Sequence, residues 1–205
     1  MAKKQYTAAD RERIYEELLD AGQRFFSEKG FSRTTLIDIY EAVGISKSFF
    51  YSFFPSKEVL AVRVLTRQRD RLLHIAEEIM ENKAESWEKK VEAFLEICLS
   101  GKKHGVFIMN LEDVPALFHH LPAEELAHFQ STQESFYLSL VTLWGLQMEP
   151  EELRIFSNKM LAVLLLKNSN LFDIPAFFPG LAEKAIQQWI EDIITRLKAY
   201  RIPVI

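Results

Sequence analysis

Glycine and proline are scarce in this chain, and their positions favour helices over other structures. Only seven of each occur in 205 residues, and neither occurs between Ser56 and Ser100. Glycine raises the entropic cost of ordering a helix and proline removes a backbone donor, so both mark interruptions. Apolar residues recur at helical spacing between these interruptions. The sequence therefore predicts an all-α fold of about nine helices.

A capping box marks the start of each of the first two helices. Thr7 precedes Asp10 by three residues, and Thr35 precedes Asp38 by the same interval. In this arrangement a hydroxyl and a carboxylate satisfy N–H groups that have no partner at a helix start. We therefore expect the first helix over residues 8–29 and the second from residue 36.

A tight turn separates the second helix from a third. Gly44 follows the second helix, which we expect to end at residue 43. Ser46 is a suitable N-cap for a third helix over residues 47–54, and Pro55 ends that helix. Two short helices joined in this way form a helix-turn-helix, whose second helix enters the major groove of DNA.

The residues around this turn resemble the DNA-binding signature of the tetracycline-repressor (TetR) family of regulators. The resemblance covers about residues 8–65. It rests on Phe25-Phe26, Gly30-Phe31, Thr34-Thr35, Asp38-Ile39, Ala42 to Lys47, and Phe50-Tyr51 to Lys57-Glu58. It implies a three-helix DNA-binding head, residues 1–57, and a helical ligand-binding and dimerisation domain, residues 58–205. Such a protein is a homodimeric repressor that leaves a palindromic double-stranded operator when a small apolar or aromatic effector binds.

The predicted DNA-binding residues gather at the second and third helices. In the family, a hydroxyl that begins the second helix, a lysine and a tyrosine of the third helix, and the lysine after it contact phosphates. The matching residues here are Thr35, Lys47, Tyr51 and Lys57. With the neighbouring polar positions, the full predicted set is Arg33, Thr34, Thr35, Ser46, Lys47, Ser48, Phe49, Tyr51, Ser52 and Lys57.

Four positions depart from the family's usual pattern. Ser48 stands where glycine is most common, and Phe49 stands where a small hydroxyl is common. Ser52 and Phe53 replace aromatic or histidine residues. An exposed Phe49 would pack against thymine methyl groups, whereas in the alternative Phe49 or Phe53 completes the core of the head. Both interpretations stay open at this point.

The net charge of −4 is compatible with DNA binding because the charge is unevenly distributed. Residues 1–57 hold nine Lys and Arg against eight Asp and Glu, whereas residues 58–205 hold 16 against 21. Local charge, and not the total, sets the potential that DNA meets. No apolar run approaches the roughly 20 residues that span a bilayer, the start lacks the apolar stretch of a secretory signal, and the single Cys98 forms no internal disulfide. We therefore expect a cytoplasmic protein without a membrane segment.

A long fourth helix is expected to begin after Ser56 and to end at a break over residues 82–86. Further helices are expected over about residues 87–99, 107–120, 123–146, 151–171 and 181–200. Many of their aromatic side chains, together with a few polar ones, match the profile of a ligand pocket, although ordinary helical core is the alternative for each residue. The predicted pocket residues are Phe107, Asn110, Phe118, His128, Phe129, Phe136, Tyr137, Trp144, Asn168 and Phe172.

The last two long helices are expected to pair with their copies in a second chain. The final helix carries apolar residues on two sides and therefore needs a partner on both. A four-helix bundle between two chains, as the resemblance implies, supplies these partners; a monomer that buries both stripes in one core is the alternative. The predicted interface residues are Phe156, Met160, Leu164, Trp189, Ile190, Ile193, Ile194 and Leu197.

Two other classes of function were weighed against this interpretation. A helical enzyme would need a nucleophile with a base or a pair of carboxylates, and no such motif is recognisable, so no catalytic residue or cofactor is predicted. His119 and His120 are adjacent, and neighbours on a helix point about 100° apart, so no metal site is predicted. The remaining alternative is a DNA-binding activator, division factor or nucleoid factor without an effector, which a solid C-terminal core would favour.

Overall fold

The computed structural model describes residues 6–101, 106–169, 171, 174, 178 and 180–202. Within these residues the chain forms nine helices and no strand, so the predicted all-α fold is confirmed. The helices are α1 (Ala8–Lys29), α2 (Leu36–Ala42), α3 (Lys47–Phe50), α4 (Lys57–Glu81), α5 (Trp87–Leu99), α6 (Asp113–His119), α7 (Ala123–Leu143), α8 (Pro150–Lys167) and α9 (Ala182–Lys198). None of them is both long and apolar enough to cross a bilayer.

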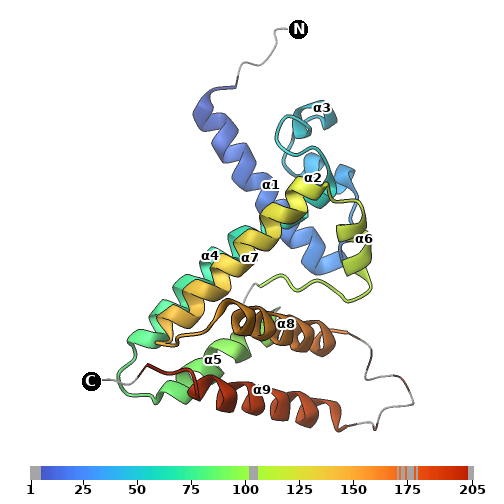
Figure 1. The fold of residues 1–205 in the computed structure, drawn as a ribbon. Helices are drawn as coiled ribbons and strands as arrows, with labels where there is room; N and C mark the ends of the chain where they lie inside the picture. Colours follow the sequence, from blue (N-terminus) through green and yellow to red (C-terminus); the bar gives the residue numbers. More distant parts are fainter. Residues whose placement is uncertain are drawn as a thin grey trace, which may run out of the picture.

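Two long helices connect the ends of the molecule. Figure 1 shows α1, α2, α3 and α6 gathered at one end, and α4 and α7 running side by side toward the other. At that second end, α9 packs against α5 and α8. Any displacement between α4 and α7 is therefore felt at both ends of the molecule.

Both predicted capping boxes are present. The N–H of Asp10 donates to the hydroxyl of Thr7 at 3.1 Å, and the N–H of Thr7 donates to the Asp10 carboxylate at 3.0 Å. Thr35 and Asp38 make the same reciprocal pair at 3.2 and 2.9 Å. Such a cap stabilises its helix by about 1 kcal/mol. The starts of α1 and α2 are therefore fixed by residues adjacent in the sequence.

Several helices are shorter than predicted. Helices α7 and α8 end at Leu143 and Lys167 and not at residues 146 and 171, and α3 and α6 are shorter for reasons that their hydrogen bonds show. Residues 51–53 form a turn, so α3 ends at Phe50 and not at residue 54. The hydroxyl of Ser52 donates to the Phe49 carbonyl at 2.7 Å. This hydrogen bond stands in for the backbone N–H that a continuing helix would supply to that carbonyl. The helix predicted over residues 107–120 begins only at Asp113, because the side chain of Gln68 exchanges two hydrogen bonds with the backbone of Phe107 and holds it extended.

The described residues pack into two hydrophobic cores. One core comprises α5, α8, α9 and the second halves of α4 and α7. The other comprises α1 to α3 and the start of α4, and it is completed by five residues that come much later in the chain: Phe107, Met109, Leu117, Leu121 and Phe129. The core of the head therefore draws on chain from both sides of the boundary predicted at residue 57.

A buried carboxylate joins α6 to the head. Asp113 begins α6, and its two carboxylate oxygens accept the N–H groups of Phe31 at 2.9 Å and Ser32 at 3.0 Å. Gly30 precedes them with φ of +84°, and a Cβ at this glycine would lie 3.1 Å from the Asp113 carboxylate. Glycine thus permits both the left-handed backbone and the close approach of the carboxylate.

We expect Asp113→Asn to destabilise the protein by about 1–3 kcal/mol, because an amide accepts through one oxygen only and leaves a buried N–H unsatisfied. The free energy of unfolding in urea measures the effect. Glu112→Gln is the matched control, since Glu112 is exposed and should change stability by less than about 0.5 kcal/mol. Equal stability of the two variants would contradict the role of Asp113.

Candidate nucleic-acid interface and ligand cavity

A glycine turn fixes α3 against α2. Gly44 has φ of +71°, in the region that favours glycine. The N–H of Gly44 donates to the Glu41 carbonyl and that of Ile45 donates to the Tyr40 carbonyl, both at 3.0 Å. The fully buried side chains of Ile39 in α2 and Phe50 in α3 then anchor the two helices in the core of the head.

Seven of the ten predicted DNA-binding residues are exposed at the start of α2 and around α3. They are Arg33, Thr35, Ser46, Lys47, Ser48, Tyr51 and Ser52. Ser46 caps α3 by accepting the N–H of Phe49 at 3.3 Å, and its hydroxyl lies 3.1 Å from that of Ser48. The ammonium of Lys47 forms no ion pair with the residues that the structure describes. This surface therefore presents hydroxyls, a phenol and a cation, all groups that donate to phosphate.

Unlike the seven exposed residues of the predicted set, Thr34 is buried and Lys57 is half-buried, and both have hydrogen-bond partners within the head. Thr34 is only 1% exposed, and its hydroxyl donates to the carbonyls of Phe25 at 3.1 Å and Gly30 at 2.8 Å. The Lys57 ammonium donates to the carbonyls of Phe31 and Thr34, each at 2.9 Å. Burial lowers the pKa of Lys57. Both side chains are used inside the head, where they hold the connection between α1 and α2.

Phe49 and Phe53 lie at the edge of the head core, as the packing alternative expects. Phe49 is half-buried and stacks on Tyr6 with ring centroids 4.2 Å apart. Phe53 meets Phe49 edge-on at 5.2 Å. The guanidinium of Arg11 lies 4.6 Å from the Phe53 ring centroid and donates to the Ser52 carbonyl at 3.2 Å. No local pattern in the sequence points to Tyr6 or Arg11, because their partners are about 40 residues away.

A cavity of about 160 Å³ lies among α4, α5, α6, α7 and α8. Five predicted pocket residues line it, namely Phe107, Phe118, Phe129, Phe136 and Tyr137. Trp144 packs instead in the core, 5.6 Å from the ring of Phe94, and the Asn168 amide caps α8 by donating to the Leu164 carbonyl. Asn110 and His128 are also absent from the cavity wall, and Phe172 lies outside the described residues. These four described residues therefore do not line this cavity, unlike the other five.

The polar part of the cavity wall was missed by the sequence analysis. Gln68, Arg69, Cys98 and Gln133 join Tyr137 there. Burial lowers the pKa of Arg69 to about 10. Arg69 looked like one more charge on a long amphipathic helix, and only the packing of α7 against α4 brings it to the cavity.

The family model described as bacterial regulatory proteins of the tetR family matches residues 18–64, the segment that contains this turn and the exposed donors. The head of the chain therefore belongs to the tetR family. The chain is thus a DNA-binding transcriptional regulator, as the resemblance implied.

Several solved structures, one of them described as a TetR-family transcriptional regulator, share the fold along nearly the whole chain. A regulator from Pectobacterium atrosepticum is 15% identical with a TM-score of 0.60, covering 96% of this chain and 98% of its own. The reduced form of Escherichia coli NemR is 17% identical with a TM-score of 0.57, covering 94% and 100%. The fatty acid degradation regulator FadR of Bacillus halodurans is 13% identical with a TM-score of 0.57, covering 95% and 99%. At these identities the likeness shows the fold alone. No curated protein matches the chain.

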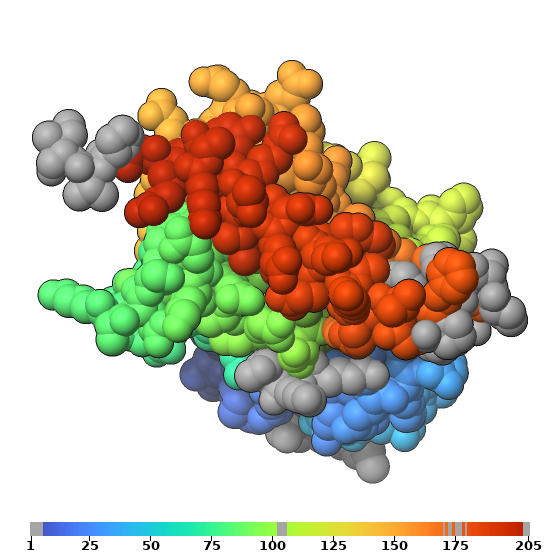
Figure 2. All heavy atoms as spheres, turned by 90° about the horizontal axis from the view of Figure 1, so that it is seen from below, coloured from blue at the N-terminus to red at the C-terminus, as the bar shows by residue number. Residues whose placement is uncertain are grey.

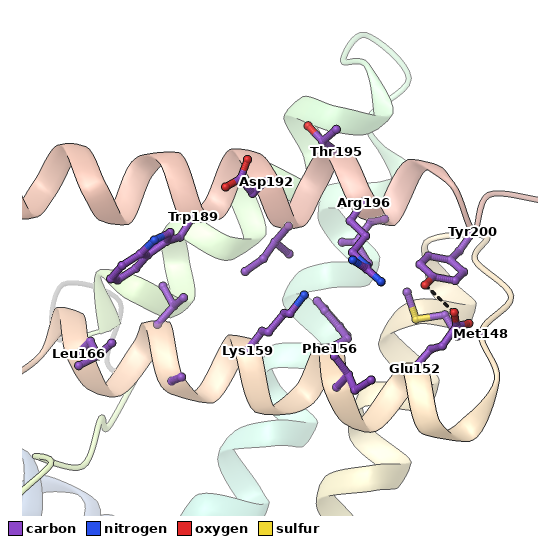
Figure 3. A pocket seen from close by; sticks show the side chains of 15 residues that line it. Met148, Glu152, Phe156, Lys159, Leu166, Trp189, Asp192, Thr195, Arg196 and Tyr200 are labelled. Atoms are coloured by element: carbon purple, nitrogen blue, oxygen red, sulfur yellow. Dashed lines mark hydrogen bonds between the residues drawn. The ribbon is translucent and has the colours of Figure 1, made fainter.

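A second hollow of this tetR-family chain is a groove of about 600 Å³ between α8 and α9. Helix α9 extends across the face seen in Figure 2. In Figure 3, Lys159 of α8 points toward α9, Trp189 and Arg196 of α9 point toward α8, and the Tyr200 hydroxyl donates to Glu152 at 2.7 Å. The groove thus combines apolar side chains with charges of both signs.

The predicted dimer-interface residues lie mostly inside the protomer. Six of them are buried in its own core, namely Phe156, Met160, Ile190, Ile193, Ile194 and Leu197. Leu164 lines the cavity, and Trp189 alone of the eight is exposed, at 39%. The two stripes of α9 are therefore largely one buried face, because α5 and α8 cover it from both sides. The residues of the groove that remain exposed include Ile155, Lys159, Asp192 and Arg196.

Cys98 is expected to react slowly with alkylating agents in the native protein. Part of the residue borders the cavity, and burial raises the pKa of its thiol to about 12, so the thiol stays protonated at neutral pH. The rate with iodoacetamide should rise little between about pH 7 and 9 in the native state. In urea it should rise with pH, as for an ordinary thiol. Equal rates in the two states would contradict this assignment.

Proposed function

We propose that the chain is a homodimeric repressor that binds a palindromic operator through α3 and is released by a small molecule bound in the cavity. The exposed donors around α3 carry the DNA-binding part of the proposal. Lys47, Tyr51 and the hydroxyls of Thr35, Ser46 and Ser48 hold phosphates and set the position of α3 in the major groove. The head gains affinity from few cations, so its salt dependence is modest for a DNA-binding protein.

The contacts of α6 support a route from the cavity to the head. Val114 and Phe118 of α6 line the cavity, and Asp113 of the same helix binds the backbone of Phe31 and Ser32. A ligand that pushes α6 outward therefore pulls on the loop that precedes α2. Two recognition helices must lie about 34–36 Å apart to enter successive turns of DNA, so a small tilt of each head weakens operator binding.

The outer face of α8 and α9 is the proposed dimer contact. It exposes Ile155 and Trp189 beside Lys159, Asp192 and Arg196. In a twofold dimer the same surface meets itself, so a patch with both signs of charge is able to pair with its copy. A stable interface buries about 800 Å² on each partner, which two helices of 17 and 18 residues are long enough to supply.

One observation favours a second candidate function. Ligand sites for drug-sized molecules usually occupy about 300–1,000 Å³, and this cavity is smaller. A DNA-binding regulator without an effector would have no use for the cavity at all. The two candidates are distinguished by whether any small molecule that binds the protein changes its affinity for the operator.

The double variant Lys47→Ala/Tyr51→Ala should bind operator DNA at least about tenfold more weakly, because it lacks two phosphate contacts. Its affinity should fall for every sequence, and the slope of log affinity against log salt should decrease by about 1. Fluorescence anisotropy with genomic fragments selected by the wild-type protein measures both quantities.

Lys83→Ala provides the matched control, since Lys83 is an exposed lysine in the connection between α4 and α5, far from the head. It should bind as the wild type does. An unchanged affinity and salt slope in the double variant would mean that α3 is not placed on DNA by these two side chains.

Ile155→Glu should dissociate the dimer, because it places a charge in the apolar part of the outer face. Ile155 is 44% exposed in the protomer. Sedimentation velocity should then give the 23.9 kDa protomer and operator affinity should drop. Leu138→Glu, at a leucine of α7 that is 53% exposed and outside the groove, should remain a dimer. A monomeric wild type, or dissociation by the control instead, would overturn the proposed interface.

A further inference from the structure

Arg69 is a part-buried cation, and the hydrogen-bond acceptors that it meets among the described residues are all neutral. Its Nη1 donates to the Phe129 carbonyl at 3.3 Å and to the Thr132 hydroxyl at 2.9 Å, and its Nη2 donates to Oε1 of Gln133 at 3.3 Å. The guanidinium also lies 4.2 Å from the ring centroid of Phe129. The Nε–H and one Nη2–H have no acceptor among the described residues, since a guanidinium carries five donors.

No carboxylate of the described residues forms an ion pair with Arg69. Arg63 and Arg67 of the same helix each pair with an acidic side chain, at 2.8 to 2.9 Å. Asp70 follows Arg69 directly but is exposed, on a different face of α4. Removing a charge from water without a counter-ion is costly, and the cost falls when an anion is supplied.

The rest of the cavity wall is apolar or neutral. Burial raises the pKa of Cys98 to about 12 and raises the pKa of Tyr137, so neither residue contributes a negative charge at neutral pH. Most of the remaining lining is aliphatic or aromatic: Leu65, Leu72, Phe94, Leu95, Phe136 and Leu140 among others. A volume of about 160 Å³ is close to that of an engineered apolar cavity that accommodates benzene. The cavity is therefore large enough for a ligand group of about one ring, which would lie beside the positive charge of Arg69.

We propose that the cavity binds a small carboxylate with an aromatic or branched aliphatic body, its carboxylate paired with Arg69. This assignment rests on the proposed function, because it names the chemical class of the effector for the same cavity. The free Nε–H and Nη2–H lie on one edge of the guanidinium and suit the two oxygens of a carboxylate. The ring or branched chain of the ligand fills the cavity and contacts its apolar side chains.

The position of Arg69 also connects this anion to the head. All its hydrogen bonds reach residues at the middle of α7, and Phe129 belongs to the core that the head shares. An anion that draws the guanidinium toward the cavity lengthens the hydrogen bonds that Nη1 donates to the Phe129 carbonyl and the Thr132 hydroxyl. Ligand binding thus loosens α7 from α4 at the point where both meet the head.

Four probes of nearly equal size test the charge requirement on the unmodified protein. They are benzoate, benzamide, benzyl alcohol and benzylammonium, with inorganic phosphate as a fifth probe without an apolar body. Isothermal titration at constant ionic strength should show benzoate binding at least about tenfold more tightly than benzamide. Benzylammonium and phosphate should not bind measurably.

Arg69→Met should weaken benzoate binding at least about tenfold and leave benzamide binding unchanged. Arg71→Met, an exposed arginine two positions further along α4, is the matched control and should bind both probes as the wild type does. Thermal unfolding establishes that each variant is folded. The comparison of probes on the wild type remains decisive even where Arg69→Met is unstable.

The possible failures of the two proposals are distinct. Benzamide binding as tightly as benzoate, preferred binding of benzylammonium or of phosphate, or no binding by any probe would each overturn the carboxylate assignment. Binding of the neutral probes alone, with release of operator DNA, would overturn this inference and leave the proposed function standing. Benzoate binding through Arg69 without any change in operator affinity would establish the inference and refute the effector role.

Discussion

The hydrophobic core of the head is incomplete within the first 65 residues of the chain, and the rest of the molecule depends on how it is closed. Phe107, Met109, Leu117, Leu121 and Phe129 complete it from the segment before α6, from α6 itself and from the start of α7. The same stretch of chain lines the cavity through Phe107, Phe118 and Phe129. A change in the cavity therefore cannot leave the head undisturbed, because one set of side chains serves both.

Because the core is shared, some polar residues of the head bind the backbone inside it, whereas others remain exposed on its surface. Thr34 and Lys57 satisfy backbone carbonyls in the connection between α1 and α2, while Asp113 satisfies two N–H groups of the same connection from the other side. The connection is thus held by hydrogen bonds from two sides. The exposed donors Thr35 and Lys47 follow it in the chain and are held in a defined place. Loss of a contact from α6 would be transmitted to them through the backbone.

The cavity has a different physical character from the surface of the head. The head's donors are exposed, and each competes with water. The guanidinium of Arg69, in contrast, is part-buried, and burial lowers its pKa to about 10. A charge in such surroundings selects a ligand by sign more strongly than an exposed lysine does, because the local screening is weak. This selectivity supports the inference that the cavity binds a carboxylate. The small volume of the cavity is consistent with a small effector.

The sequence by itself determined the helices, their caps and the glycine turn, because these depend on residues three or four positions apart. Thr7 with Asp10, Thr35 with Asp38 and the left-handed Gly44 are local interactions, and they are present as expected. The exposed set around α3 was equally accessible to sequence reasoning. Only the tertiary structure decided which polar side chains turn inward. Thr34, Lys57 and Arg69 look like ordinary surface residues along the chain, and the apolar faces of α8 and α9 are typical of a dimer interface as much as of a core. Their roles depend on which distant helix packs against them, and the free energy of that packing is a property of the whole fold and not of any short stretch of sequence.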